Sequence, residues 1–140
     1  MDESHVGEIR EASPDGTPPA RPVTGHRCIE CDEVDALLGG RRWTDVADDF
    51  PQYCHDAFPL LTPAAKIYYV PAYMCCDIGS PGNMAGLSIQ SALERGDLAP
   101  AAFTSPQRAV ILRWARRYYQ DQPEGHPPEE LIARWQDVKE

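Results

Sequence analysis

The sequence has no long hydrophobic run and few basic residues. No apolar stretch approaches the roughly 18 residues that a membrane-spanning helix needs, and the first residues lack the basic start and apolar core of a secretion signal. The 13 Lys and Arg residues are outnumbered by 22 Asp and Glu residues, which gives a formal net charge of −9. A strongly acidic chain is repelled by nucleic-acid backbones and by anionic membrane surfaces. We therefore expect a cytoplasmic protein with no nucleic acid and no membrane as its partner.

Strand patterns and internal repeats are also missing. No segment alternates apolar and polar residues in the way that predicts a half-buried strand, and no period typical of solenoids is present. Apolar residues recur instead at helical spacing, and 140 residues suit one domain. The sequence predicts an all-α fold, a compact orthogonal domain of five or six helices over residues 23–140. Residues 1–22 are expected to form a flexible N-terminal arm with one short helix and a proline-rich linker.

Capping residues predict where two of the helices begin. Thr62 precedes Pro63, and threonine caps free backbone amides while proline loses nothing at the first helical position. This helix is expected to be the central one, with either a kink or a break at Pro71, which lacks a backbone N–H. Ser105, followed by Pro106, is expected to cap a second strong helix.

The cysteines are unevenly placed along the chain. Five cysteines are an odd number in a chain that is not small, so reduced, metal-bound or redox-active thiols are expected in place of a disulfide framework. His26, Cys28 and Cys31 form an H-x-C-x-x-C box, which places three donor groups within six residues. The two cysteines lie at the start of an expected helix that Gly39 and Gly40 are expected to end.

The box predicts a zinc site. Zinc accepts thiolate and imidazole in a tetrahedral set, and two cysteines one helical turn apart point the same way. His26, Cys28 and Cys31 would supply three ligands, and His55 is our expected fourth. The remaining candidates for that fourth position are Cys54, Cys75 and Asp32. Such a site would fix the proline-rich segment to the core of a zinc-binding interaction domain, with a protein partner and no assigned small-molecule substrate.

Two other functions are compatible with the same residues. In a thiol oxidoreductase or redox sensor, Cys28 would attack as the thiolate and Cys31 would resolve the mixed disulfide. The chain lacks the βαβ pattern of thioredoxin-like sites, which counts against this alternative. In a metal-free, partner-binding protein of the immunity type, the two cysteines would simply pack. No triad, phosphate loop or paired carboxylates stand out, so enzyme activity is the minority hypothesis.

The other conspicuous side chains have simpler explanations. His5, in the arm, and His126, in a proline-flanked loop, are expected to be solvated. The arginines of the 105–120 helix are expected to form a solvated face opposite its apolar stripe, and the tyrosines of the central helix are expected to pack in the core. These residues are Arg113, Arg116 and Arg117, and Tyr68, Tyr69 and Tyr73.

Several segments occur in an order that resembles a known pattern. They are residues 8–12, 26–33, Trp43, 60–65, 68–73 and 105–110. Together they resemble a family of small bacterial proteins of unknown function, with an H-x-C-x-E-C-D-E box, a tryptophan and a Y-x-x-P-A-Y segment. His26, Cys28, Glu30 and Cys31 match the family's box, whereas the other three cysteines match nothing in its pattern. Because the family is uncharacterised, the resemblance implies no activity, and it leaves the fourth ligand to His55, a carboxylate or water.

Overall fold

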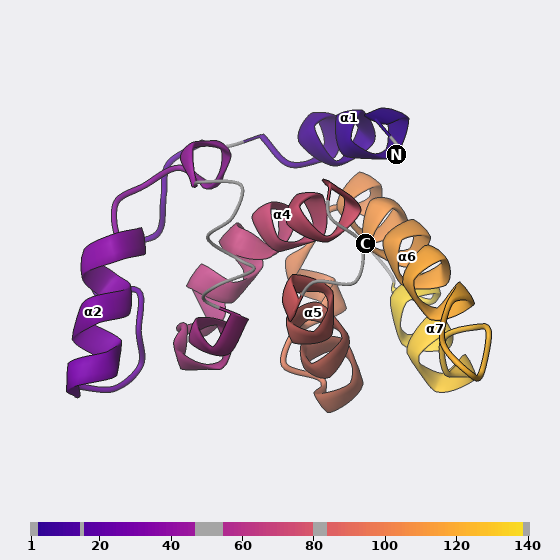
Figure 1. The fold of residues 1–140 in the computed structure, drawn as a ribbon. Helices are drawn as coiled ribbons and strands as arrows, with labels where there is room; N and C mark the ends of the chain where they lie inside the picture. Colours follow the sequence, from indigo (N-terminus) through magenta and orange to yellow (C-terminus); the bar gives the residue numbers. More distant parts are fainter. Residues whose placement is uncertain (1–2, 15, 47–54, 80–83, 139–140) are drawn as a thin grey trace.

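The fold is built from helices (Figure 1). The computed structural model describes residues 3–14, 16–46, 55–79 and 84–138. Within these residues the α-helices are α1 (Glu3–Ala12), α2 (Ile29–Leu38), α4 (Pro63–Gly79), α5 (Met84–Arg95), α6 (Ser105–Gln120) and α7 (Glu129–Gln136). Short 3-10 helices are η1 (Trp43–Asp45), η2 (His55–Leu60) and η3 (Pro100–Ala102). The prediction of an all-α domain of five or six helices is confirmed.

Helix α4 is the central helix, as predicted. Thr62 caps it, because the Thr62 Oγ1 accepts the backbone N–H of Ala65 at 3.2 Å. The helix continues through Pro71 without ending, so the alternative of a break at this proline is wrong. Tyr69 and Tyr73 are buried on it, and the helix packs against α5, α1 and η1. No described helix combines the length and apolar content that a membrane span requires.

Helix α1 packs on the core of the domain. Its Ile9 is fully buried, and the helix lies against α6 and α4 (Figure 1). Glu8 forms an ion pair with Arg113 of α6. His5 is 0% exposed, so the prediction that this histidine is solvated is wrong. The error arose because Val6 and Ile9 are too few apolar residues to predict a docked helix. Whether residues 1–22 are flexible stays a prediction.

Helix α6 begins one residue earlier than the sequence predicted. Its N-cap is Thr104, whose Oγ1 accepts the N–H of Gln107 at 3.3 Å, while Gln107 Oε1 accepts the N–H of Thr104 at 2.9 Å. These reciprocal bonds are a capping box, which satisfies two amides that the helix leaves free. Ser105 is the first helical residue and Pro106 the second. Because serine and threonine are both good caps, the sequence alone favoured the wrong one.

The C-terminal end of α2 is attached to α4 by a tyrosine. The Tyr69 hydroxyl lies 2.9 Å from the carbonyl oxygen of Leu38 and 2.6 Å from that of Arg41. Burial raises the pKa of Tyr69 to about 12. The hydroxyl therefore stays protonated and available as a donor at neutral pH. This contact holds the end of α2 in place while its N-terminus lies at the edge of the domain (Figure 1).

Candidate functional site

The N-terminus of α2 is built around the two cysteines of the box. Cys28 is the N-cap in an extended conformation, with φ −156° and ψ 170°, and its Sγ accepts the backbone N–H of Cys31 at 3.3 Å. Its carbonyl oxygen accepts the N–H of Asp32 at 2.9 Å, the first bond of the helix. A sulfur atom thus takes the place of the oxygen that usually caps a helix. The prediction that both cysteines lie at the start of this helix is confirmed.

The two thiols differ in exposure and in their hydrogen bonds. Cys28 is exposed, whereas Cys31 is fully buried, and both are free. The pKa of Cys31 is raised, first because its thiol hydrogen-bonds to the side chain of Cys28, and second because it is buried. The backbone of His26 and the side chain of Thr24 act in the opposite direction. The arrangement keeps Cys31 as a protonated donor, with the exposed Cys28 sulfur as its acceptor.

The segment before the box is fixed to α2 by an acidic side chain. Asp35 Oδ2 accepts the Arg21 Nη2–H at 2.8 Å, and its Oδ1 accepts the backbone N–H of Val23 at 2.8 Å. Hydrogen bonding from Arg21 lowers the pKa of Asp35 more than any other contact does. Asp35 was missed in the sequence because it lies 14 and 12 residues from its partners, and no local spacing rule connects such positions.

A short antiparallel bridge then joins the segment to the residues that precede α4. Thr24 pairs with Leu61, the N–H of Gly25 donates to the Leu60 carbonyl at 3.1 Å, and the N–H of Thr62 donates to the Val23 carbonyl at 2.9 Å. The sequence predicted that a bound metal would fix this segment. In the structure, backbone hydrogen bonds and the Asp35 carboxylate already do so.

The expected zinc ligands do not come together in the described part of the chain. No group of three or more His, Cys, Asp or Glu side chains in residues 3–14, 16–46, 55–79 and 84–138 is placed to hold a metal ion. His26 is exposed, and its backbone contacts the Cys31 thiol. Cys54 and the side chain of His55 lie outside the described residues. Cys75 is half-buried in α4. The zinc site therefore stays a prediction.

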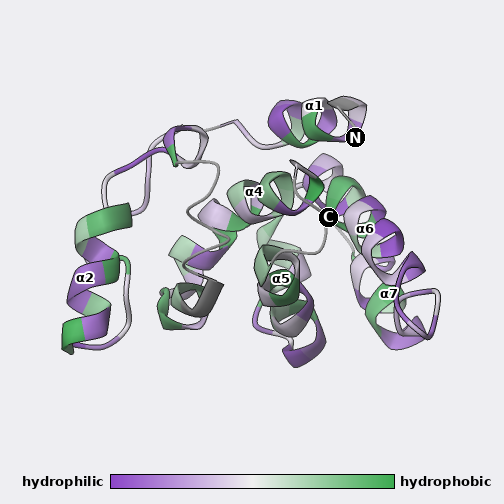
Figure 2. Cartoon of the chain, viewed as in Figure 1, coloured by the Kyte–Doolittle hydropathy of each residue, from purple (hydrophilic) through white to green (hydrophobic). Residues whose placement is uncertain are grey.

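The surface around Cys28 combines apolar and charged groups. Ile29, the next residue, is 79% exposed, and Leu37 on the same helix is 53% exposed. Figure 2 shows hydrophobic segments on α2, which stands apart from the other helices. A groove of about 540 Å³ lies beside the box, and its lining includes the side chains of His26 and Arg27.

The fold and the site define an all-α domain that carries a pair of reduced cysteines, one exposed and one buried, at a helix N-terminus. Comparison of the chain with protein-family models, with curated proteins and with solved structures finds no match. The resemblance of the box to a family of small bacterial proteins stays a prediction.

Proposed function

We propose that the protein performs reversible thiol–disulfide chemistry with Cys28 and Cys31. The observation that carries this proposal is the unequal pair: an exposed Cys28 sulfur accepts the backbone amide of a buried Cys31 at 3.3 Å. Helix N-termini and Cys-x-x-Cys motifs are environments that activate thiolates. An exposed attacking thiol beside a protected second thiol is the arrangement that dithiol–disulfide exchange uses.

The reaction has two steps. The Cys28 thiolate attacks one sulfur of an external disulfide, forms a mixed disulfide and releases the other sulfur as a thiolate. Cys31 then loses its proton to solvent or to that thiolate and attacks Cys28, which releases the second thiolate. The external disulfide gains two electrons, and the protein dithiol is oxidised to a Cys28–Cys31 disulfide. The contact with Cys28, and then burial, raise the pKa of Cys31, so Cys31 is protonated when Cys28 makes the first attack.

The test is oxidation by glutathione disulfide, with the thiols trapped by alkylation and read by mass spectrometry. The wild type is expected to form the intramolecular disulfide reversibly. Cys31→Ser should accumulate glutathione on Cys28, and Cys28→Ser should leave Cys31 unmodified because it is buried. Cys75→Ser, which changes a thiol on α4, is the matched control and should behave as wild type. A wild type that stays reduced in excess glutathione disulfide would contradict the proposal.

Metal analysis of the same reduced protein separates this function from the zinc-binding one. A stoichiometric zinc ion that blocks oxidation until it is chelated would overturn the redox proposal in favour of the zinc-binding interaction domain. Unreactive cysteines without metal would favour the partner-binding, immunity-like alternative. The cytoplasmic location, where thiols are kept reduced, stays a prediction that fits either use of the cysteines.

A further inference from the structure

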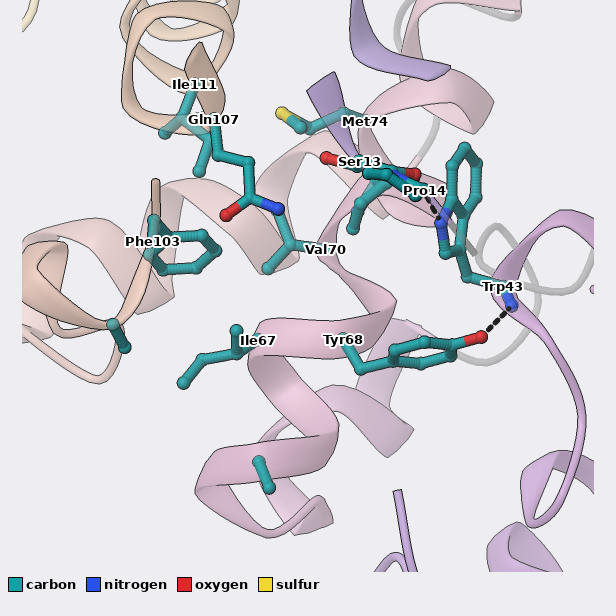
Figure 3. Close-up of a pocket in the computed structure, with 13 residues that line it drawn as sticks. Ser13, Pro14, Trp43, Ile67, Tyr68, Val70, Met74, Phe103, Gln107 and Ile111 are labelled. Carbon is teal, nitrogen blue, oxygen red and sulfur yellow. Dashed lines mark hydrogen bonds between the residues drawn. The ribbon is translucent and has the colours of Figure 1, made fainter. Parts of the chain in front are cut away.

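A second cavity is lined by no residue of the cysteine box. Its volume is about 200 Å³, and five segments line it: the end of α1, η1, α4, the η3 region and α6 (Figure 3). Three aromatic side chains, Trp43, Tyr68 and Phe103, form much of its wall. None of its described lining residues is charged. A pocket that combines apolar side chains with a few placed polar groups is the usual form of a small-molecule site.

The aromatic walls are held in place by hydrogen bonds. The Trp43 indole N–H donates to the carbonyl oxygen of Ser13 at 3.0 Å, and the backbone N–H of Trp43 donates to the Tyr68 hydroxyl at 3.2 Å (Figure 3). These two bonds tie three segments together at the cavity. Side chains that are fixed before a ligand arrives lose little entropy when it binds.

Gln107 gives the cavity a hydrogen-bond donor. Its Oε1 accepts the N–H of Thr104 at 2.9 Å, which fixes the orientation of the carboxamide because only the oxygen can accept that hydrogen. The Nε2, with its N–H groups, must then point the other way. Figure 3 shows this nitrogen on the side of Val70, facing the cavity.

Pro71 removes the usual helix bond of a carbonyl group that belongs to a lining residue of the cavity. A proline inside a helix has no N–H to donate to the carbonyl four residues earlier, which here belongs to Ile67. Both Pro71 and Ile67 line the cavity. The carbonyl oxygen of Ile67 therefore lacks its usual hydrogen bond within the helix. Ile67 and Gln107 line the same pocket.

We infer that this cavity binds a small, neutral, planar aromatic molecule that carries an amide or an equivalent donor–acceptor pair. Apolar cavities of about 150 Å³ bind benzene, so about 200 Å³ suits one aromatic ring with a small substituent. The ligand's carbonyl would accept from Gln107 and its N–H would donate to Ile67. A neutral ligand is expected because no described lining residue is charged and none would give a charged ligand an ionic partner. This inference is independent of the chemistry proposed for the cysteines.

Benzamide is the probe for this inference. It would be titrated into ¹⁵N-labelled protein while the indole N–H signal of Trp43 is followed. We expect a saturable shift of that signal. Cyclohexanecarboxamide, which keeps the amide but lacks a planar ring, and acetophenone, which lacks the N–H donor, should each bind several-fold more weakly. Absence of saturation with benzamide would overturn the inference.

Gln107→Glu tests the donor without removing the helix cap, because glutamate can also complete a capping box at this position. The variant keeps an oxygen for the Thr104 amide but has no N–H for the ligand, so benzamide should bind at least tenfold more weakly. Gln120→Glu, which is exposed at the end of the same helix, is the matched control and should keep wild-type affinity. Thermal unfolding of both variants checks that they fold. Equal affinity in wild type and Gln107→Glu would refute the assigned pose and site.

Discussion

At the scale of single residues, the buried carboxylate of Asp77 shows how tightly α4, α5 and α6 are packed. Its Oδ2 accepts the indole N–H of Trp114 at 3.0 Å, and burial raises its pKa above the usual value. The ring of Tyr118 stacks on Trp114, with centroids 4.8 Å apart. Gly86 of α5 faces both Asp77 and Tyr118. The absence of a side chain at this glycine is what lets the three helices approach.

Gly86→Ala is expected to destabilise the protein by about 1 to 3 kcal/mol, the usual cost of overpacking. A Cβ at this position would lie 2.5 Å from Asp77 Oδ1 and 2.6 Å from Tyr118 Cε1. In an open helix the same change is favourable by up to about 1 kcal/mol. Gly7→Ala in α1 is the matched control, since no atom lies within 4 Å of its Cβ. Urea unfolding should therefore show opposite signs for the two variants, and a stabilised Gly86→Ala would contradict the packing described.

At the scale of elements, the sequence was informative about local structure and uninformative about long-range contacts. The Thr62 cap, the stop at Gly39 and the position of Cys28 at a helix start follow from rules that act within a few residues, and each is confirmed. Asp35 holds the entry segment through partners more than ten residues away. Such a contact depends on which distant segments meet in the fold, and the spacing of apolar residues does not predict that.

Asp35→Ala is expected to destabilise the native state by about 1 to 2 kcal/mol at neutral pH, because it removes an acceptor from Val23 and from Arg21. Arg21→Ala should cost less, since the side chain of Arg21 is 53% exposed and exposed pairs contribute little. Chemical unfolding of the two variants at pH 7 measures this difference. A larger effect for Arg21→Ala would show that the ion pair, and not the bond to Val23, holds the segment.

The contribution of Asp35 to the free energy of unfolding is also expected to depend on pH. The folded pKa of Asp35 is lowered from its usual value of 3.8, so its stabilisation is complete above that value and is lost as the pH falls through the folded pKa. The stability difference between wild type and Asp35→Ala should therefore shrink as the pH is lowered from about 5 to about 2. Unfolding curves recorded across this range test the sign, and a difference that grows on acidification would contradict it.

At the scale of the whole molecule, the helices differ in how much of their surface packs against the rest of the domain. Helix α4 packs against α5, α1 and η1, whereas α2 packs against η2 and has only Cys31 and Leu38 buried among its own residues. The proposed redox pair thus sits on the least buried of the internal helices, at the edge of the domain (Figure 1). The sequence predicted the helix and its cysteines but could not predict this position, because amphipathic spacing does not say which helices a face will meet.

This unequal packing predicts that α2 opens without the rest of the protein. Regions with few buried apolar contacts open at lower free energies than the core. In native-state hydrogen exchange, the amides of α2 should exchange through openings at least about 2 kcal/mol less costly than those of the middle of α4, around Val70. Such local opening would let the buried Cys31 attack a mixed disulfide on Cys28 without global unfolding. Equal opening free energies in α2 and α4 would instead make α2 part of one cooperative unit with the core and would contradict the prediction of local opening.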